Sequence, residues 1–226
     1  MTLPITLSGL PRLAAGLLTS AALALVALPA VAQTATEAPA AEAAAPELAP
    51  DLALGAEDAP VTMIEYASFT CSHCGAFATD VFPTLKSEYI DTGKVRFIQR
   101  DVYFDALGLW AGILARCEPA KFYPVSEQLL TGQSQWLAGV SSSDQAAENL
   151  RRVGLAAGMT NEQMDACWGD TEQVERLVAT YQANATADGI EGTPTFIIGG
   201  EKVQNQAWDG LKAKIDEKLA EAESAN

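Results

Sequence analysis

The stretch Val61-Thr-Met-Ile-Glu-Tyr-Ala-Ser-Phe-Thr-Cys-Ser-His-Cys74 decides what kind of fold this chain can have. Its first half, Val61 to Ala67, is a short apolar run rich in β-forming residues, and it follows a turn-like Asp-Ala-Pro. Apolar residues at helical spacing begin after Ser72. The sequence therefore predicts a Cys-x-x-Cys pair at the point where a buried strand passes into a helix.

That position gives the two cysteines of the motif different roles. At a helix N-terminus, free backbone N–H groups and the helix dipole stabilise a thiolate, which is the nucleophile that attacks disulfides. We therefore expect Cys71 to be the exposed attacking sulfur. Cys74 lies one turn further on, close enough to close a disulfide and to resolve a mixed intermediate.

His73 is the only histidine of the chain, and it stands between the two cysteines. Its imidazolium or N–H would add to thiolate stabilisation, which favours the reduced form and makes the disulfide a stronger oxidant.

The alternative to a redox role for the Cys-x-x-Cys motif is that it forms half of a zinc site or a structural disulfide. Zinc needs further ligands, and the remaining cysteines, Cys117 and Cys167, fall on separate apolar helix faces. We expect redox chemistry, with no metal and no cofactor.

Glu65 is the second informative residue, because a carboxylate is a poor choice for an apolar strand. In a central strand it would lie under the cysteines with a raised pKa, where it could exchange a proton with Cys74. In an edge strand it would be partly exposed and carry no role. The pattern alone leaves both alternatives open.

Beyond the motif, helix and strand alternate. Apolar spacing predicts a helix from Ser72 to about Gly93, interrupted by Pro83, which cannot donate a backbone hydrogen bond. Lys94 to Arg100 predicts a second strand. The economical arrangement is a β-α-β unit with parallel strands.

A helical block follows, because residues 105–187 contain helical patterns and no strand pattern. Capping-box sequences at Ser142 to Gln145 and Thr160 to Gln163 indicate separate helices, and Gly154 and Gly158 are the expected stops.

The C-terminal part predicts two strands and a helix. Thr195 to Ile198 and Glu201 to Val203 flank the turn Gly199-Gly200, which is typical of a hairpin, and Trp208 to Leu219 has helical spacing. The chain order is β-α-β, helical block, β-β-α. It indicates an α/β core with an inserted helical lobe.

The N-terminal region is expected to be processed. Residues 1–32 carry one charge, Arg12, an apolar run and an Ala-Val-Ala ending, which is typical of a cleaved signal peptide; an uncleaved membrane anchor is the alternative. Residues 33–50 are Ala, Pro, Glu and Thr-rich and are expected to be a disordered linker. The folded domain is expected to start near Asp51.

Composition narrows the class of partner. The formal net charge is −15 over 226 residues, and the 14 basic residues form no stripe, which argues against a nucleic-acid partner. Four cysteines in an exported chain indicate an oxidising compartment.

The segment from Glu65 to Cys74 resembles the DsbA family of periplasmic thiol:disulfide oxidoreductases, in which an acidic strand residue precedes a Cys-Pro-His-Cys type motif. Gly192-Thr-Pro-Thr-Phe196 is similar to the second signature of that family, a proline that follows a cis peptide bond and faces the cysteines. The resemblance covers about residues 51–222. It implies a thioredoxin fold with a helical insertion at about 105–187.

The resemblance also implies site residues. Thr193 and Pro194 would contact the substrate peptide, and Cys117 and Cys167 are expected to form a second disulfide, with two buried free thiols as the alternative. Ser72 departs from the family, whose best-known members have proline there, so a milder oxidant is also compatible with the sequence.

The expected function is a monomeric periplasmic oxidase that introduces disulfides into exported proteins and is reoxidised by a membrane-bound, DsbB-like partner. One alternative is a disulfide isomerase or reductase, although isomerases of this kind usually have an added dimerisation domain, for which residues 33–55 are too short. Another is a peptide-binding chaperone module without redox turnover.

Overall fold

The computed structural model describes residues 47–225, in which a single sheet is built around strand β2 (Val61–Ala67). The other strands are β1 (Ala53–Leu54), β3 (Val95–Asp101), β4 (Thr195–Ile198) and β5 (Glu201–Gln204). Their order is β1-β3-β2-β4-β5, with β2 parallel to β3 and antiparallel to β4. The signal peptide predicted for residues 1–32 and most of the predicted linker lie outside the described residues.

The helical segment between β2 and β3 is continuous but not uniform. It consists of α1 (Ser72–Ala76), the π-helical η1 (Phe77–Val81), α2 (Phe82–Leu85) and the π-helical η2 (Lys86–Ile90). Pro83 lies in the first turn of α2, directly after a π-helical turn. Because proline has no N–H, the regular hydrogen-bond ladder is interrupted there, as predicted. Gly93 has φ +75° and follows the end of the segment.

Within residues 106–187, which form the inserted block, all the regular secondary structure is helical. The helices are α3 (Ala106–Ala115), η3 (Pro119–Lys121), α4 (Phe122–Thr131), α5 (Gln133–Trp136), α6 (Ser143–Ala156), α7 (Asn161–Gly169) and α8 (Thr171–Ala187). After the hairpin β4–β5, helix α9 (Trp208–Ser224) ends the described chain. The predicted order β-α-β, helical block, β-β-α is confirmed.

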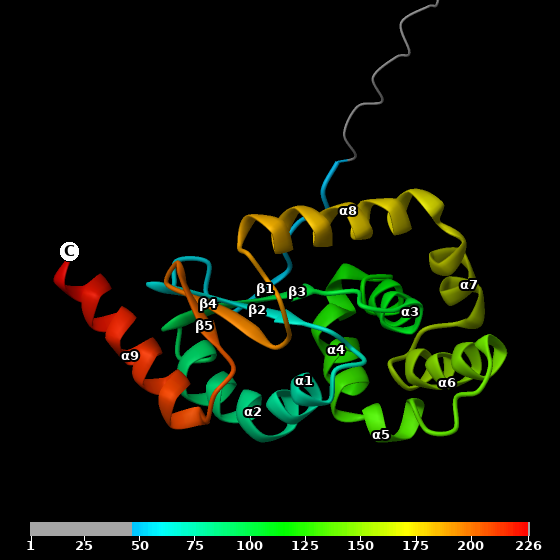
Figure 1. The fold of residues 1–226 in the computed structure, drawn as a ribbon, viewed down its shortest axis with the longest axis horizontal. Coiled ribbons are helices and arrows are strands. Elements are labelled where there is room, and N and C mark those ends of the chain that lie inside the picture. Colours follow the sequence, from blue (N-terminus) through cyan, green and yellow to red (C-terminus); the bar gives the residue numbers. More distant parts are fainter. Residues whose placement is uncertain (1–46, 226) are drawn as a thin grey trace, which may run out of the picture. The chain divides into compact units, whose positions relative to one another are not determined.

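Two hydrophobic cores hold these layers together. One lies between the sheet and the helices α2 and α9, and it includes Phe97, Phe196 and Ile215, none of which is more than 1% exposed. The other lies inside the helical block around Leu114, Phe122 and Leu150. Figure 1 shows α8 on the opposite side of the sheet from α2 and α9, with α3 to α7 beside the sheet.

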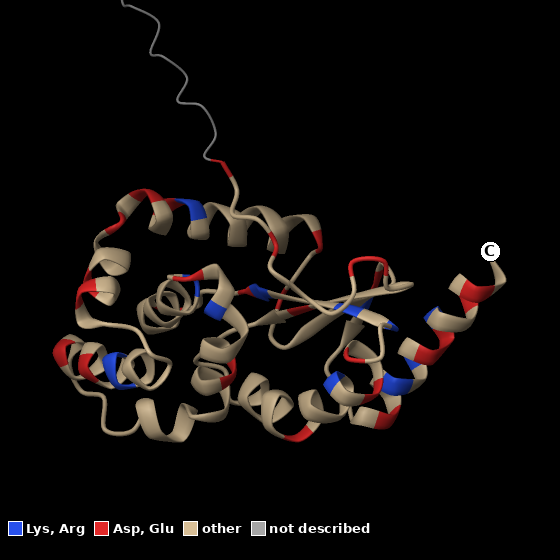
Figure 2. Cartoon of the chain, turned by 180° about the vertical axis from the view of Figure 1, so that it is seen from behind, with Lys and Arg blue, Asp and Glu red and all other residues tan. Residues whose placement is uncertain are grey.

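Helix α9 is held on the sheet partly by charge. Figure 2 shows basic and acidic residues alternating along it, and Lys214 and Lys218 both form ion pairs with Glu201 of β5. No helix within residues 47–225 is both long and apolar enough to cross a membrane.

Three details of the sequence analysis need correction. Gly154 was expected to end a helix, but it lies inside α6, where a Cβ would approach the Met164 sulfur to 2.3 Å. The stop is at Gly158, which has φ +76°. Cys117 was expected on a helix face, but α3 ends before it. Strand β1 was missed, because a two-residue strand has no pattern to detect.

Candidate active site

Cys71 is the N-cap residue of α1, and a short loop of residues 68–70 joins it to the carboxyl end of β2. Its carbonyl oxygen accepts hydrogen bonds from the N–H groups of Cys74 and Gly75, both at 3.1 Å. Cys71 is partly exposed and Cys74 is fully buried, and both are free thiols. The arrangement gives one sulfur access to solvent and hides the other, as the sequence predicts for an attacking and a resolving cysteine.

The surroundings of Cys71 favour its thiolate. They lower its pKa from 9.0 to about 5, mainly through a hydrogen bond from the Cys74 side chain, and further through Thr193 and the backbone N–H groups of Cys74 and His73, against the opposing effect of burial. The His73 imidazole is exposed, so the contribution seen here comes from its backbone. The predicted role of the imidazole stays a prediction.

Cys74 has the opposite tendency. Its hydrogen bond to Cys71 raises its pKa, and burial and the nearby charge of Glu65 raise it further. At neutral pH the pair therefore exists as a Cys71 thiolate beside a Cys74 thiol. Nucleophilicity is concentrated on the accessible sulfur.

Glu65 occupies the central strand, where it is 2% exposed. In the sheet it lies opposite Gln99 of β3 and Phe196 of β4, so the edge-strand alternative is wrong. Its Oε1 atom has no hydrogen-bond partner among the described residues. Burial, and then the negative charges of Cys71 and Asp101, raise its pKa to about 8.

A small cavity adjoins Glu65. The side chains of Gln99, Ser126 and Glu127 also line it. The space open to the centre of a water molecule is about 20 Å³, and one ordered water needs about 10 to 15 Å³ of such space. Ser126 Oγ is a second buried atom without a partner among the described residues. The cavity therefore has room for one water molecule beside the Glu65 side chain.

Thr193 lies against Cys71, and Pro194 follows it in the chain. The peptide bond between them is cis, and the Cys71 thiol donates a hydrogen bond to the Thr193 carbonyl oxygen at 3.3 Å. The Thr193 hydroxyl oxygen is buried and has no hydrogen-bond partner within the described residues. Backbone atoms that precede a strand therefore face the reactive sulfur.

The loop before Cys71 is tied to the helical block at two points. The Thr70 hydroxyl donates to Asp105 at 2.7 Å, and the other oxygen of Asp105 caps α3 by accepting from the Gly108 N–H. Gln133 of α5 donates to the Phe69 and Cys71 carbonyls. Neither Asp105 nor Gln133 was predicted from the sequence. Asp105 carries a detectable signal, since it precedes a helical run. Gln133 carries none, because nothing in the sequence shows which carbonyls a distant amide meets.

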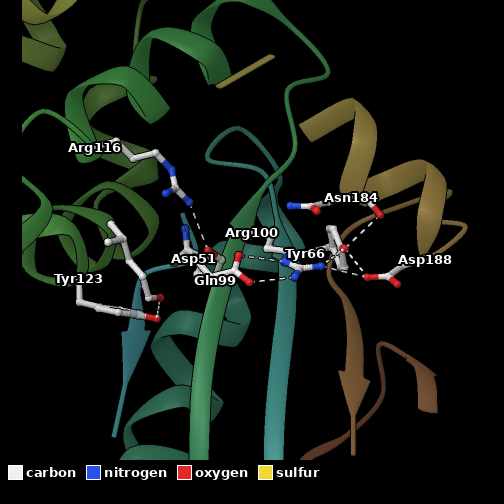
Figure 3. A network of polar contacts seen from close by, with 9 residues as sticks. Asp51, Tyr66, Gln99, Arg100, Arg116, Tyr123, Asn184 and Asp188 are labelled. Atoms are coloured by element: carbon white, nitrogen blue, oxygen red, sulfur yellow. Dashed lines mark hydrogen bonds and ion pairs between the residues drawn. The ribbon is translucent and has the colours of Figure 1, made fainter. Parts of the chain in front are cut away.

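A polar network lies on the face of the sheet covered by α8 (Figure 3). Arg100 is at its centre and binds Asp51, Asp188 and the Tyr66 hydroxyl, which also donates to Asp188 and to the Asn184 carbonyl. The network joins the start of the described chain, the sheet and the end of α8.

Next to this network, Arg116 binds the buried Asp101 at 2.6 Å. Asp101 also accepts from Gln99 and Tyr103. The negative charge of Asp101 contributes to the raised pKa of Glu65.

Cys117 and Cys167 are joined in a disulfide. It links the segment after α3 to α7, and Trp168 beside it donates to the Trp110 carbonyl. No group of three or more His, Cys, Asp or Glu side chains within residues 47–225 is arranged to hold a metal ion.

Comparison with known proteins assigns this fold to one family. The thioredoxin family model matches residues 47–217. The chain belongs to the thioredoxin family, and within it to the DsbA-like proteins, for the following reasons.

A Rickettsia bellii protein whose name assigns it to the protein-disulfide oxidoreductases is 32% identical over 77% of this chain and 66% of its own length. Disulfide bond formation protein D of Bacillus subtilis is 26% identical over 77% of this chain and 79% of its own. The crystal structure of Wolbachia pipientis α-DsbA1 superposes with a TM-score of 0.72 at 27% identity, covering 80% of this chain and 96% of that one. The chain spans about two thirds or less of the rickettsial relatives.

Proposed function

We propose that this chain is a thiol:disulfide oxidoreductase that works as an oxidase, passing the Cys71–Cys74 disulfide to other proteins. The observation that carries the proposal is the stabilised thiolate of Cys71, whose pKa is lowered to about 5. A stable thiolate is a good leaving group. The dithiol form of the protein is therefore favoured, and the disulfide is readily transferred to a client dithiol.

In the first step, a client thiolate attacks the Cys71 sulfur of the oxidised protein. The Cys71–Cys74 bond breaks, a client–Cys71 disulfide forms, and Cys74 leaves with the electron pair. Because Cys74 is buried and its pKa is raised, the leaving sulfur takes up a proton. Protonated Glu65, whose pKa is raised first of all by burial, is the adjacent donor, and its proton is restored through the cavity beside it.

In the second step, another client thiolate attacks the client sulfur of the mixed disulfide. The client gains a disulfide, Cys71 departs as its stabilised thiolate, and two electrons now reside on the protein dithiol. An oxidant must then remove them. We expect a membrane-bound, DsbB-like partner to do so, with the protein a periplasmic monomer exported by the signal peptide expected at residues 1–32.

The client is expected to bind along the backbone at Thr193 and Pro194. The Thr193 carbonyl faces Cys71 and precedes β4, so an extended client peptide could pair with it while its cysteine meets the sulfur. The names of the relatives, a protein-disulfide oxidoreductase and a disulfide bond formation protein, support the same activity.

Trapping tests the assignment of roles. A Cys74→Ala variant mixed with a disulfide-containing peptide should accumulate a mixed disulfide through Cys71, and Cys71→Ala should accumulate none. The oxidised wild-type protein should form disulfides in reduced, unfolded ribonuclease in stoichiometric amounts. Reduction of a client disulfide by the dithiol form, without oxidation of the ribonuclease, would favour the reductase or isomerase alternative. Full client binding and cellular activity in a Cys71→Ser/Cys74→Ser variant would favour the chaperone alternative.

A further inference from the structure

Gln133 of α5 bonds directly to the backbone of the reactive cysteine. Its Nε2 donates to the carbonyl oxygens of Phe69 at 2.8 Å and of Cys71 at 2.9 Å, across 64 and 62 positions of sequence. The Cys71 carbonyl also accepts the N–H groups that begin α1. Hydrogen bonds from α1 and from the helical block therefore hold the carbonyl oxygen of Cys71 at the same time.

The fit at this contact depends on Gly75. A Cβ at Gly75 would lie 2.4 Å from Gln133 Oε1 and 3.0 Å from the Leu130 carbonyl oxygen, closer than a side chain tolerates. Gly75 also lies in α1, one residue after Cys74. A side chain at Gly75 would therefore displace the Gln133 amide from its place beside α1.

Helix α5 is itself fixed by its neighbours in the block. Trp136 donates through Nε1 to the Leu129 carbonyl of α4 at 2.7 Å, and Asn149 of α6 donates to the Trp136 carbonyl at 2.7 Å. Trp136 is 2% exposed and Asn149 is 4% exposed. Because buried hydrogen bonds hold both sides of α5, the Gln133 amide has a defined position relative to Cys71.

We infer that Gln133 is a positioning residue through which the helical block holds the first turn of α1 so that the His73 and Cys74 N–H groups stay directed at the Cys71 sulfur. The inference rests on the proposed function. Without the Gln133 amide, the loop before Cys71 is still held by the hydrogen bond from Thr70 to Asp105. The loop therefore becomes more mobile but stays folded. A looser turn stabilises the thiolate less, and the pKa of Cys71 rises.

The test compares Gln133→Met, which keeps the length and removes the donor, with Gln135→Met, an exposed residue on the same helix. The pKa of Cys71 is read from the pH dependence of alkylation by iodoacetamide, and the thermal midpoint is recorded for each protein. We expect Gln133→Met to raise the pKa by about half to one unit, the effect of one ordinary hydrogen bond. Gln135→Met should match the wild type.

A shorter amide adds a second variant in case Gln133→Met does not fold. Gln133→Asn keeps the donor but reaches less far, so it should give a smaller rise in the same direction. A wild-type pKa in the variant that folds would overturn the inference, as would an equal rise in Gln135→Met. If instead the wild-type Cys71 itself titrates near the ordinary thiol value of about 8.5, the proposed function fails and not the role of Gln133.

Discussion

The Cys71 sulfur lies 3.3 Å from the carbonyl oxygen of Thr193, although 122 positions separate the two residues. As a thiol, Cys71 can donate to this oxygen; as a thiolate, it has no proton to donate. Ionisation therefore frees the carbonyl for another donor, and a client backbone N–H is suited to that place. The relationship connects the charge state of the nucleophile with the availability of the expected peptide-binding group.

Glu65→Gln should slow exchange and stabilise the protein. Without an ionisable group beside Cys74, proton transfer to and from the buried sulfur loses its catalyst, and we expect the rate to fall about 10²-fold. Replacing a buried carboxyl that has an unpartnered oxygen should raise the free energy of unfolding by about 1 kcal/mol or more. Stopped-flow oxidation of a dithiol peptide and urea unfolding measure the two effects. An unchanged rate would remove Glu65 from the mechanism.

The stability of the reduced protein should depend on pH through two opposing groups. Cys71 has its pKa lowered from 9.0 to about 5, so between these values the unfolded state binds the extra proton and stability rises with pH. Glu65 has its pKa raised from 4.5 to about 8, so the folded state binds the extra proton and stability falls with pH. Between about pH 5 and 8 the two nearly cancel.

Single variants should separate the contributions of Cys71 and Glu65 to the pH dependence of stability. The stability of the wild type changes little over this range, whereas Cys71→Ser should lose stability as pH rises above about 4.5. The loss should end below pH 8, because the Cys71 charge no longer raises the pKa of Glu65. Glu65→Gln should gain stability up to about pH 9. Urea unfolding under reducing conditions at several pH values gives the slopes. Identical slopes in all three proteins would show that neither group titrates as described.

Arg116→Met should destabilise the protein strongly. Asp101 is buried, with 2% of its side chain exposed, and Arg116 is its ion-pair partner. Removing that partner leaves an uncompensated buried charge, which costs about 3 to 5 kcal/mol. Thermal or chemical unfolding measures the loss. The double variant Arg116→Met/Asp101→Asn should recover part of it, and a failure to recover any would point to lost packing of the arginine.

The disulfide between Cys117 and Cys167 should contribute stability without taking part in exchange. It closes a loop with a sequence separation of 50, and its removal should cost about 4 kcal/mol in the chain-entropy description. A Cys117→Ala/Cys167→Ala variant should unfold at lower denaturant concentration and retain its exchange rate per folded molecule. A parallel loss of rate in fully folded protein would assign this pair a redox role.

Much of the fold follows from local patterns that the structure reproduces. The capping box at Thr160 and Gln163 is present with both of its hydrogen bonds, and the hairpin turn lies at Gly199 and Gly200, both with positive φ. These features depend on a few consecutive residues, which a sequence displays directly. The helix end predicted at Gly154 was wrong, because glycine occurs both at helix ends and inside helices where another side chain packs closely. Only the position of Met164 shows that Gly154 belongs to the second case.

Those residues of the candidate site that lie in one short segment or one known motif could be predicted from the sequence. Cys71, Cys74 and Glu65 were found from one strand and one turn, and the structure settles the strand as central. Gln133 and Ser126 were missed because they reach the site from the helical block through tertiary contacts. Hydrogen bonds between residues over sixty positions apart leave no periodic signal in one sequence.

The reduction potential of the Cys71–Cys74 pair tests the oxidase proposal most directly. Equilibration with glutathione buffers at pH 7, followed by quantification of both forms, gives the value. A thiolate two pKa units more stable than that of thioredoxin, whose pKa is about 7, shifts the potential upward from about −270 mV by roughly 60 mV, so we predict about −210 mV or higher. A potential at or below about −270 mV would contradict the oxidase assignment and make the dithiol a reductant.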